Sequence, residues 1–155
     1  MSTAQTWQTE STSLEDTLAL AERIGRNMKG GEMVELVSDL GGGKTAFVRG
    51  LAKGIGSKDP VSSPSFTLSN EYDAGKLRLY HFDFYRLTEP GIMRDELAEC
   101  LADPEAVVAV EWADIVEDVL PTERLTIKIE STGDMSRALT FTYPAKLAYL
   151  LPNNT

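Results

Sequence analysis

One short stretch of the chain combines the residue types that bind phosphate. Residues 38–45 read Ser-Asp-Leu-Gly-Gly-Gly-Lys-Thr, and they follow the apolar run 33–37 and precede a helix-like segment. Glycines let backbone N–H groups approach phosphate oxygens, Lys44 can reach the β and γ phosphates, and the Thr45 hydroxyl can ligate Mg²⁺. Ser38 stands where the pattern G-x-x-x-x-G-K-[ST] has Gly, but the later glycines still supply the close approach. The sequence therefore predicts a nucleoside triphosphate site. The expected contacts are Asp39, Leu40, Gly41, Gly42, Gly43, Lys44, Thr45 and Ala46.

Two acidic residues follow strand-like runs and could complete a hydrolytic site. Asp83 ends the run that starts at Leu79, and Glu111 ends the fully apolar run 106–110. The carboxyl ends of parallel strands lie where ligands of α/β sheets bind, so both carboxylates are expected at that edge. A carboxylate there can hold Mg²⁺ or orient the attacking water. The sequence leaves open which acid orients the water, and in so acidic a chain either could be an ordinary surface residue.

The elements expected to position these residues alternate between helical and strand patterns. A helix over 14–28 begins where Ser13 and Asp16 resemble an N-cap box. The other expected elements are a strand over 32–37, a helix over 44–55, a hairpin of 66–72 and 77–84, a helix over 91–101, a buried strand over 106–110, a hairpin of 125–130 and 138–143, and a tail element over 147–151. This order predicts an α/β fold in one domain over 1–155: a P-loop NTPase-like, mostly parallel sheet flanked by helices, with antiparallel β-hairpin additions.

Composition limits the classes of partner. The formal net charge of −9 over 155 residues argues against direct binding to a nucleic-acid backbone, which relies on clustered Lys and Arg. No apolar run approaches the length of a membrane-spanning helix, and the first residues show no secretory pattern. We therefore expect a cytoplasmic protein with no membrane role, and any RNA would have to be held by a partner.

Four motifs occur in an order that resembles one known family. They are the loop 38–45, Val-Ser-Ser-Pro-Ser-Phe-Thr-Leu at 61–68, Leu-Tyr-His-Phe-Asp-Phe-Tyr-Arg-Leu at 79–87 and Val-Glu-Trp at 110–112. Together they resemble the bacterial TsaE (YjeE) family, the small P-loop ATPase of tRNA threonylcarbamoyladenosine synthesis. The resemblance runs from about Leu14 to Arg137, and Ser38 and Ser65 depart from the residues that the family usually has there.

The resemblance implies roles for the residues at the phosphate end of the site. Lys44 would bind the phosphates of ATP, while Thr45 and Glu111 would coordinate Mg²⁺. Asp83 would sit near the metal and the γ phosphate, as a ligand or as the group that orients water. Thr67, with the preceding segment 62–66, looks like a switch whose conformation follows the γ phosphate.

Other residues of these motifs keep more than one interpretation. Trp112 looks like the family's aromatic residue beside the metal acid, but core packing is an alternative. The resemblance also implies that Ser13 and Gly133 would line the adenosine side. For His81, the lone histidine, strand alternation favours a sheet-face or partner-facing position over a catalytic one. Arg86 could stabilise transition-state charge or bind an acidic partner.

The function implied by the resemblance is slow ATP hydrolysis that drives or resets a complex modifying adenosine 37 of tRNA. The implied partners are the TsaD and TsaB proteins, with TsaD transferring the threonylcarbamoyl group and holding the RNA. A small-molecule P-loop kinase is an alternative, although such kinases add an arginine-rich lid and an acceptor pocket. A GTPase or a nonenzymatic nucleotide sensor is another, although the chain has no Asn-Lys-x-Asp element.

Overall fold

A computed structural model describes residues 4–38, 43–59, 69–85, 87, 89 and 91–152. The elements in these residues are β1 (Gln5–Ser11), α1 (Leu14–Arg26), β2 (Met33–Val37), α2 (Lys44–Ile55), β3 (Ser69–Asp73), β4 (Arg78–Asp83), α3 (Gly91–Ala102), β5 (Ala106–Glu111), the 3-10 helix η1 (Ala113–Val119), β6 (Leu125–Ser131), β7 (Arg137–Tyr143) and the 3-10 helix η2 (Ala145–Leu150). Within this part of the chain, no helix is both long and apolar enough to span a membrane.

One mixed sheet forms the centre of the molecule. Its strand order across the described residues is β1-β7-β6-β2-β5-β4-β3. The central strands β6, β2, β5 and β4 pair in parallel, whereas β3 at one edge and β7 and β1 at the other pair antiparallel with their neighbours. The predicted α/β class is confirmed, with the parallel part in the middle and the hairpins outside it.

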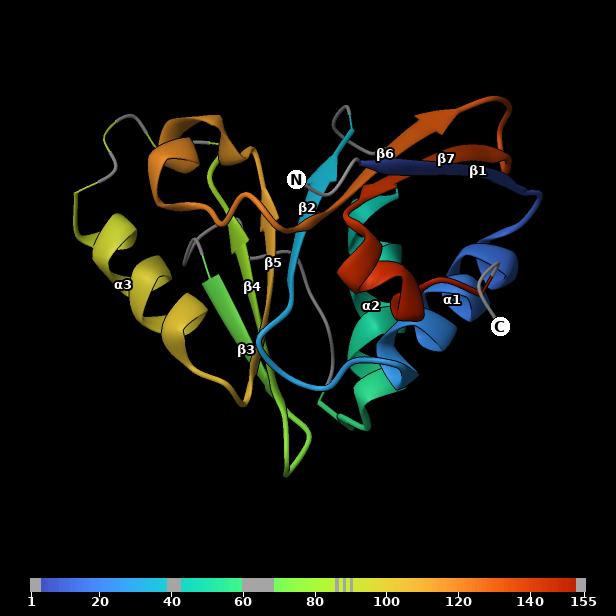
Figure 1. Cartoon of the computed structure of the whole chain (residues 1–155). Coiled ribbons are helices and arrows are strands. Elements are labelled where there is room, and N and C mark those ends of the chain that lie inside the picture. Colours follow the sequence, from blue (N-terminus) through green and yellow to red (C-terminus); the bar gives the residue numbers. More distant parts are fainter. Residues whose placement is uncertain are drawn as a thin grey trace.

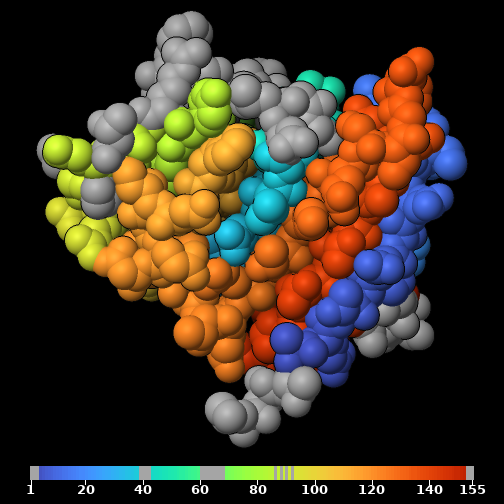
Figure 2. All heavy atoms as spheres, turned by 90° about the horizontal axis from the view of Figure 1, so that it is seen from above, coloured from blue at the N-terminus to red at the C-terminus, as the bar shows by residue number. Residues whose placement is uncertain are grey.

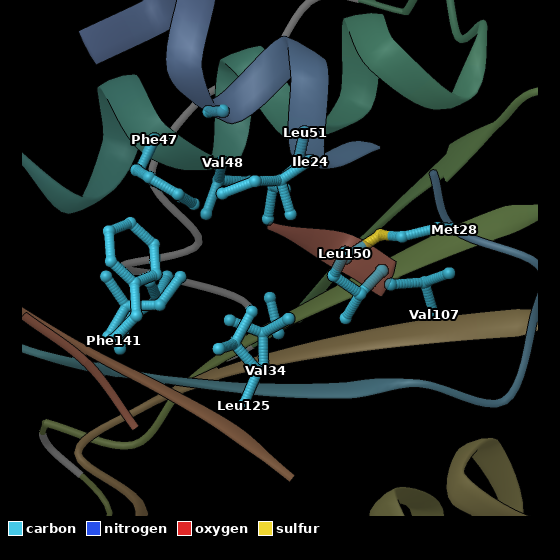
Figure 3. Packing of buried hydrophobic residues seen from close by; sticks show 14 of the residues in the cluster. Ile24, Met28, Val34, Phe47, Val48, Leu51, Val107, Leu125, Phe141 and Leu150 are labelled. Carbon is cyan, nitrogen blue, oxygen red and sulfur yellow. The ribbon is translucent and has the colours of Figure 1, made fainter. Parts of the chain in front are cut away.

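Helices lie on both faces of the sheet but leave part of one face uncovered. Helices α1 and α2 lie side by side on one face, and α3 and η1 lie on the other (Figure 1). Figure 3 shows side chains of α1 and α2, among them Ile24, Phe47 and Leu51, pointing toward Val34 and Leu125 of the strands. A second cluster joins Leu97 of α3 to strands β2, β4 and β5. The face of β6, β7 and β1 that points away from α1 and α2 lies at the surface, where these strands form adjacent bands (Figure 2).

Glycines bring α1 and α2 into very close contact. A Cβ atom added at Gly50 would lie 2.5 Å from the Ala21 Cβ, and one at Gly54 would lie 2.3 Å from the Glu22 carbonyl oxygen. Real Cβ atoms do not approach other atoms so closely, so α2 keeps this position only because these residues have no side chain. The packing fixes the direction of α2 and therefore the place of its first residues.

The observed elements confirm most of the expected ones. Helix α2 spans the predicted residues, because Gly43 and Gly56 at its two ends both adopt positive φ. The N-cap of α1 is also confirmed, since the Asp16 N–H donates to Ser13 Oγ at 3.1 Å. The predicted hairpins are β3–β4 and β6–β7, and residues 66–68 of the first one lie outside the described part.

Four elements differ from the sequence-based expectation. Helix α1 ends at Arg26 instead of residue 28, because the backbone N–H groups of Lys29 and Gly30 bind Glu32. The predicted tail element is the short helix η2, and η1 was not predicted at all. Strand β1 was also missed, because its sequence is largely polar and its place depends on pairing with β7, where Trp7 stacks on Phe141 with ring centroids 5.1 Å apart.

Candidate nucleotide and metal site

Lys44 is the first residue of α2 and is almost completely buried, with 6% of its surface exposed. Its Nζ donates a hydrogen bond to the Ser38 carbonyl oxygen at 3.1 Å and lies 3.5 Å from Glu111 Oε1. Ser38 directly follows β2, and Glu111 is the last residue of β5. The lysine thus joins the start of the helix to the carboxyl ends of two neighbouring parallel strands.

Asp83 and Glu111 end neighbouring strands and lie side by side at the same edge of the sheet. The parallel pairing of β4 with β5 places these two residues opposite one another in register. Glu111 is buried, at 4% exposed, whereas Asp83 is half-buried and its Oδ1 accepts a hydrogen bond from the Tyr85 N–H at 3.0 Å. Burial raises the pKa of Asp83, and the negative charge of Glu111 adds to the rise, while the Tyr85 bond opposes it.

The beginning of α2 offers backbone N–H donors. Gly43, its N-cap, has φ +105°, a conformation that residues with a side chain rarely adopt, and none of the described side chains caps the helix. The first-turn N–H groups of an α-helix have no partner within the helix, so those of Lys44 and Thr45 can donate hydrogen bonds to an anion. Thr45 follows Lys44 as predicted. These features fit a phosphate chain at this helix end.

The described residues also fit a magnesium site completed by phosphate. Among them, no group of three or more His, Cys, Asp and Glu side chains gathers closely enough to hold a metal ion by itself. Mg²⁺ in nucleotide sites is commonly held by one or two carboxylates together with substrate phosphates and water. Glu111, Asp83 and the Thr45 hydroxyl offer such a partial ligand set.

Trp112 lies directly against the lysine. Lys44 Nζ sits 4.7 Å from the centroid of the indole ring. The centroids of the Tyr85 and Trp112 rings lie 5.0 Å apart. Trp112 is also the one described residue other than glycine with a positive φ, at 56°. Its Nε1 is buried and has no hydrogen-bond partner among the described residues. The ring packs against the core and also contacts Lys44, while a contact of Trp112 with nucleotide stays a prediction.

A small hollow of about 130 Å³ adjoins the N-terminal end of α2. It is lined by Ser13, Leu14, Thr17, Gly43, Ala46, Met135 and Arg137. Ser13 and Ala46 were expected near the nucleotide. Gly133 belongs to the same hairpin turn as Met135, and its carbonyl oxygen accepts a hydrogen bond from Arg137 at 3.3 Å. Met135 and Arg137 were missed, because no short motif marks them and the hairpin reaches this place only through the β6–β7 pairing.

A larger hollow lies elsewhere on the molecule. It opens at the start of β6 and the end of β7 and includes Arg124 and Thr142. Arg124 is already engaged there, since its guanidinium donates to Glu35 at 2.9 Å and to Glu117 at 2.8 Å. The smaller hollow includes Gly43, the residue before Lys44, and a third hollow of about 100 Å³ is lined by Lys44 and Trp112 among others.

His81 is the site residue whose role the sequence left undefined. It is fully buried on the face of β4 that points toward α2, and its Nε2 contacts Glu111 Oε2. A sheet-face position was expected and is confirmed. The contact itself could not be read from the sequence, because it depends on the register in which β4 pairs with β5.

Several predicted site residues lie outside the described part of the chain. They are Asp39, Leu40, Gly41 and Gly42 of the phosphate loop, Thr67 with the segment 62–66, and Arg86. Their roles remain predictions. The described residues that the fold brings together at one sheet edge are Gly43, Lys44, Thr45, Asp83, Glu111 and Trp112.

Comparison with known proteins points to one family. The family model described as "Threonylcarbamoyl adenosine biosynthesis protein TsaE" matches residues 11–139. The chain is 42% identical over 132 residues to the tRNA threonylcarbamoyladenosine biosynthesis protein TsaE of Bacillus subtilis, covering 83% of this chain and 80% of that protein. It is 37% identical over 130 residues to the TsaE protein of Treponema pallidum, covering 84% and 96%. The crystal structure of Bacillus subtilis YdiB superposes with a TM-score of 0.78 at 34% identity, covering 98% of this chain and 95% of that one.

Proposed function

The chain belongs to the TsaE family, whose members are named for threonylcarbamoyladenosine biosynthesis in tRNA, and we propose that it binds ATP with Mg²⁺ and hydrolyses it slowly in support of that modification. The observation that carries the proposal is the contact of Lys44 with Glu111 at the N-terminal end of α2, with Asp83 on the next strand. A basic residue, two acids and free helix amides are the groups that a P-loop ATPase uses.

Binding would begin at the start of α2. The backbone N–H groups of the loop and of Lys44 and Thr45 would hold the phosphate oxygens, helped by the positive end of the helix dipole. Lys44 now pairs with Glu111 and would turn to the β and γ phosphates, which carry more negative charge than one carboxylate. The adenosine would lie toward the hollow formed by Ser13, Ala46 and the hairpin that carries Gly133.

Glu111 and the Thr45 hydroxyl would then hold the metal. When bound, Mg²⁺ would neutralise charge on the phosphates and polarise the bond to be broken. Asp83 is placed in this proposal near the γ phosphate, where it or Glu111 would orient the attacking water, and Thr67 would respond to the presence of that phosphate.

The remaining part of the proposal concerns partners. A net charge of −9 disfavours direct contact with tRNA, so the RNA would be held by the protein that transfers the threonylcarbamoyl group. The family resemblance points to TsaD for that role, with TsaB as the second partner. In this account the chain acts as one P-loop ATPase domain in the cytoplasm, and its hydrolysis drives or resets the complex that modifies adenosine 37.

The test is ATP hydrolysis by the purified chain with Mg²⁺, alone and with the cognate TsaD and TsaB proteins. We expect weak phosphate release alone, stimulation by the pair, and loss of both in Lys44→Ala. Product analysis separates the alternatives. A phosphorylated small acceptor would favour a kinase, and nucleotide binding without turnover under any condition would favour a nonenzymatic sensor.

A further inference from the structure

The buried histidine contacts one oxygen of the metal-site acid and leaves the other to the lysine. His81 is fully buried, and its Nε2 meets Glu111 Oε2. Glu111 Oε1 is the oxygen that lies 3.5 Å from Lys44 Nζ. The two oxygens of one carboxylate thus have different neighbours, one on β4 and one on α2.

The chemistry of the contact fixes which group donates. An ionised carboxylate only accepts hydrogen bonds, so the proton between the two residues belongs to His81 Nε2. His81 Nδ1 is buried and has no hydrogen-bond partner among the described residues. Nε2 is thus the ring atom that meets Glu111, and Nδ1 takes no part in the contact.

We propose that His81 is a positioning residue that holds Glu111 by Oε2 and so presents Oε1 to Mg²⁺ when nucleotide binds; this rests on the proposed ATP and Mg²⁺ site. Lys44 occupies Oε1 in the present structure and exchanges it for the phosphates. His81 itself touches neither the nucleotide nor the metal. Without this donor the carboxylate could rotate about its terminal bond, and the metal would find its ligand in the wrong orientation for part of the time.

The location of His81 supports a task confined to Glu111. The register pairs His81 with Ala109, and Glu111 lies two residues further along the same face of β5. The residues before His81 and Glu111 on this face, Leu79 and Ala109, belong to the apolar core under α1 and α2. The histidine is thus held between a rigid core and the carboxylate, which limits its freedom to turn away. Groups that hold a metal ligand in this way typically change metal affinity about 10- to 100-fold when removed.

Two amide variants that differ in reach test the proposal. The amide nitrogen of Gln lies about as far from the backbone as Nε2 does, whereas that of Asn lies about as far as Nδ1. His81→Gln can therefore still donate to Glu111, but His81→Asn cannot. The affinity for a non-hydrolysable ATP analogue is measured by calorimetry in EDTA and at increasing Mg²⁺. We expect His81→Asn to raise the Mg²⁺ concentration for half-saturation about 10- to 100-fold, with the EDTA affinity unchanged, and His81→Gln to restore most of the loss.

A purely structural role for His81 would give a different pattern. It would lower the melting temperature of both variants and leave the Mg²⁺ half-saturation at the wild-type value, which would overturn the proposal. The wild-type titration is a separate control, because failure of the wild type to bind the analogue would refute the ATP site itself. Wild-type binding with an unaltered Mg²⁺ dependence in His81→Asn would refute only the role of His81.

A measurement on the unmodified protein covers the case in which His81→Asn does not fold. The chain contains one histidine, so its imidazole nitrogen signals in NMR are unambiguous. We expect a slowly exchanging proton on Nε2 in the free protein and also in the complex with Mg²⁺ and the ATP analogue. A proton found only on Nδ1, or an Nε2 proton that exchanges rapidly once the complex forms, would overturn the proposal.

Discussion

Two buried glutamates lie at opposite ends of the same sheet and are held in opposite ways. Glu32 precedes β2 and is 5% exposed, and Glu111 ends β5 and is 4% exposed. Glu32 accepts hydrogen bonds from the backbone N–H groups of Lys29 at 2.8 Å and Gly30 at 2.7 Å, and from the Tyr149 hydroxyl at 2.5 Å. The carboxylate of Glu111 instead contacts two side chains of the described residues, those of Lys44 and His81.

Under the proposed function, the difference separates a structural carboxylate, that of Glu32, from a functional one, that of Glu111. Backbone N–H groups cannot turn away without unfolding the turn, so the Glu32 contacts are permanent. Lys44 can leave Glu111 by rotating its side chain, and the Glu111 carboxylate is then available to the proposed metal ion. Unpaired polar atoms also gather at only one of the two ends: His81 Nδ1 and Trp112 Nε1 are the buried side-chain atoms without a partner among the described residues. Such unsatisfied groups and strained backbone are typical of functional sites.

Substitution of the two charged residues at the Glu111 end should give the largest effects. Lys44→Ala removes charged contacts to two phosphates, and we expect ATP affinity to fall by about 100- to 1000-fold. Glu111→Ala leaves the lysine and the helix amides in place, so binding without metal should persist while hydrolysis falls about 100-fold or more. Calorimetry in EDTA and phosphate release with Mg²⁺ measure the two quantities. Retained hydrolysis in both variants would refute the site assignment.

The same comparison shows what the sequence could and could not predict. The ends of α2 were predictable because Gly43 and Gly56 mark them, and the meeting of Asp83 with Glu111 followed from their places at strand ends. The His81 contact with Glu111 was not, because it depends on strand register. The bond from Tyr149 to Glu32 joins residues 117 positions apart, and no local pattern contains that information.

The Glu32 end should affect stability and not nucleotide. Lys29 and Gly30 donate to different oxygens of Glu32. Glu32→Gln replaces one of these oxygens by an amide nitrogen, which cannot accept a hydrogen bond, so one of the two N–H groups loses its acceptor. We expect the free energy of unfolding to fall by about 1–3 kcal/mol, since bonds to a charged acceptor are lost and a donor is left unpaired. Denaturant titration measures this change. ATP affinity should equal that of the wild type, and a large drop in affinity would mean that the two ends of the sheet are coupled.

A matched pair of aromatic substitutions sharpens the contrast further. Tyr149→Phe removes a hydroxyl that donates to Glu32 and keeps the ring under Lys29, so we expect a loss of about 1 kcal/mol in the free energy of unfolding. Trp112→Phe removes an Nε1 that has no described partner and keeps an aromatic ring near Lys44. Removal of an unpaired buried N–H offsets part of the packing lost with the smaller ring, so the free energy of unfolding should fall by less than in Tyr149→Phe. Equal losses in the two variants would contradict the distinction between the two ends.

The smallest expected effect is a difference in alkaline stability between the wild type and Tyr149→Phe. Burial raises the pKa of Tyr149, and its hydrogen bond to Glu32 adds to the rise. The unfolded chain releases the tyrosine proton near pH 10, whereas the folded protein retains it. The stabilisation from the protonated hydroxyl is thus fully present below about pH 10 and declines as the pH rises further, toward the folded pKa.

Burial also raises the pKa of Tyr80 and that of Cys100, the latter to about 11, so wild-type stability alone would not isolate Tyr149. Denaturant titrations of both proteins at neutral pH and above pH 10 isolate it by difference, and we expect the gap between them to narrow as the pH rises. A gap that stays constant with pH would show that Glu32 does not depend on the Tyr149 proton, and that the backbone N–H groups of Lys29 and Gly30 are sufficient to hold it.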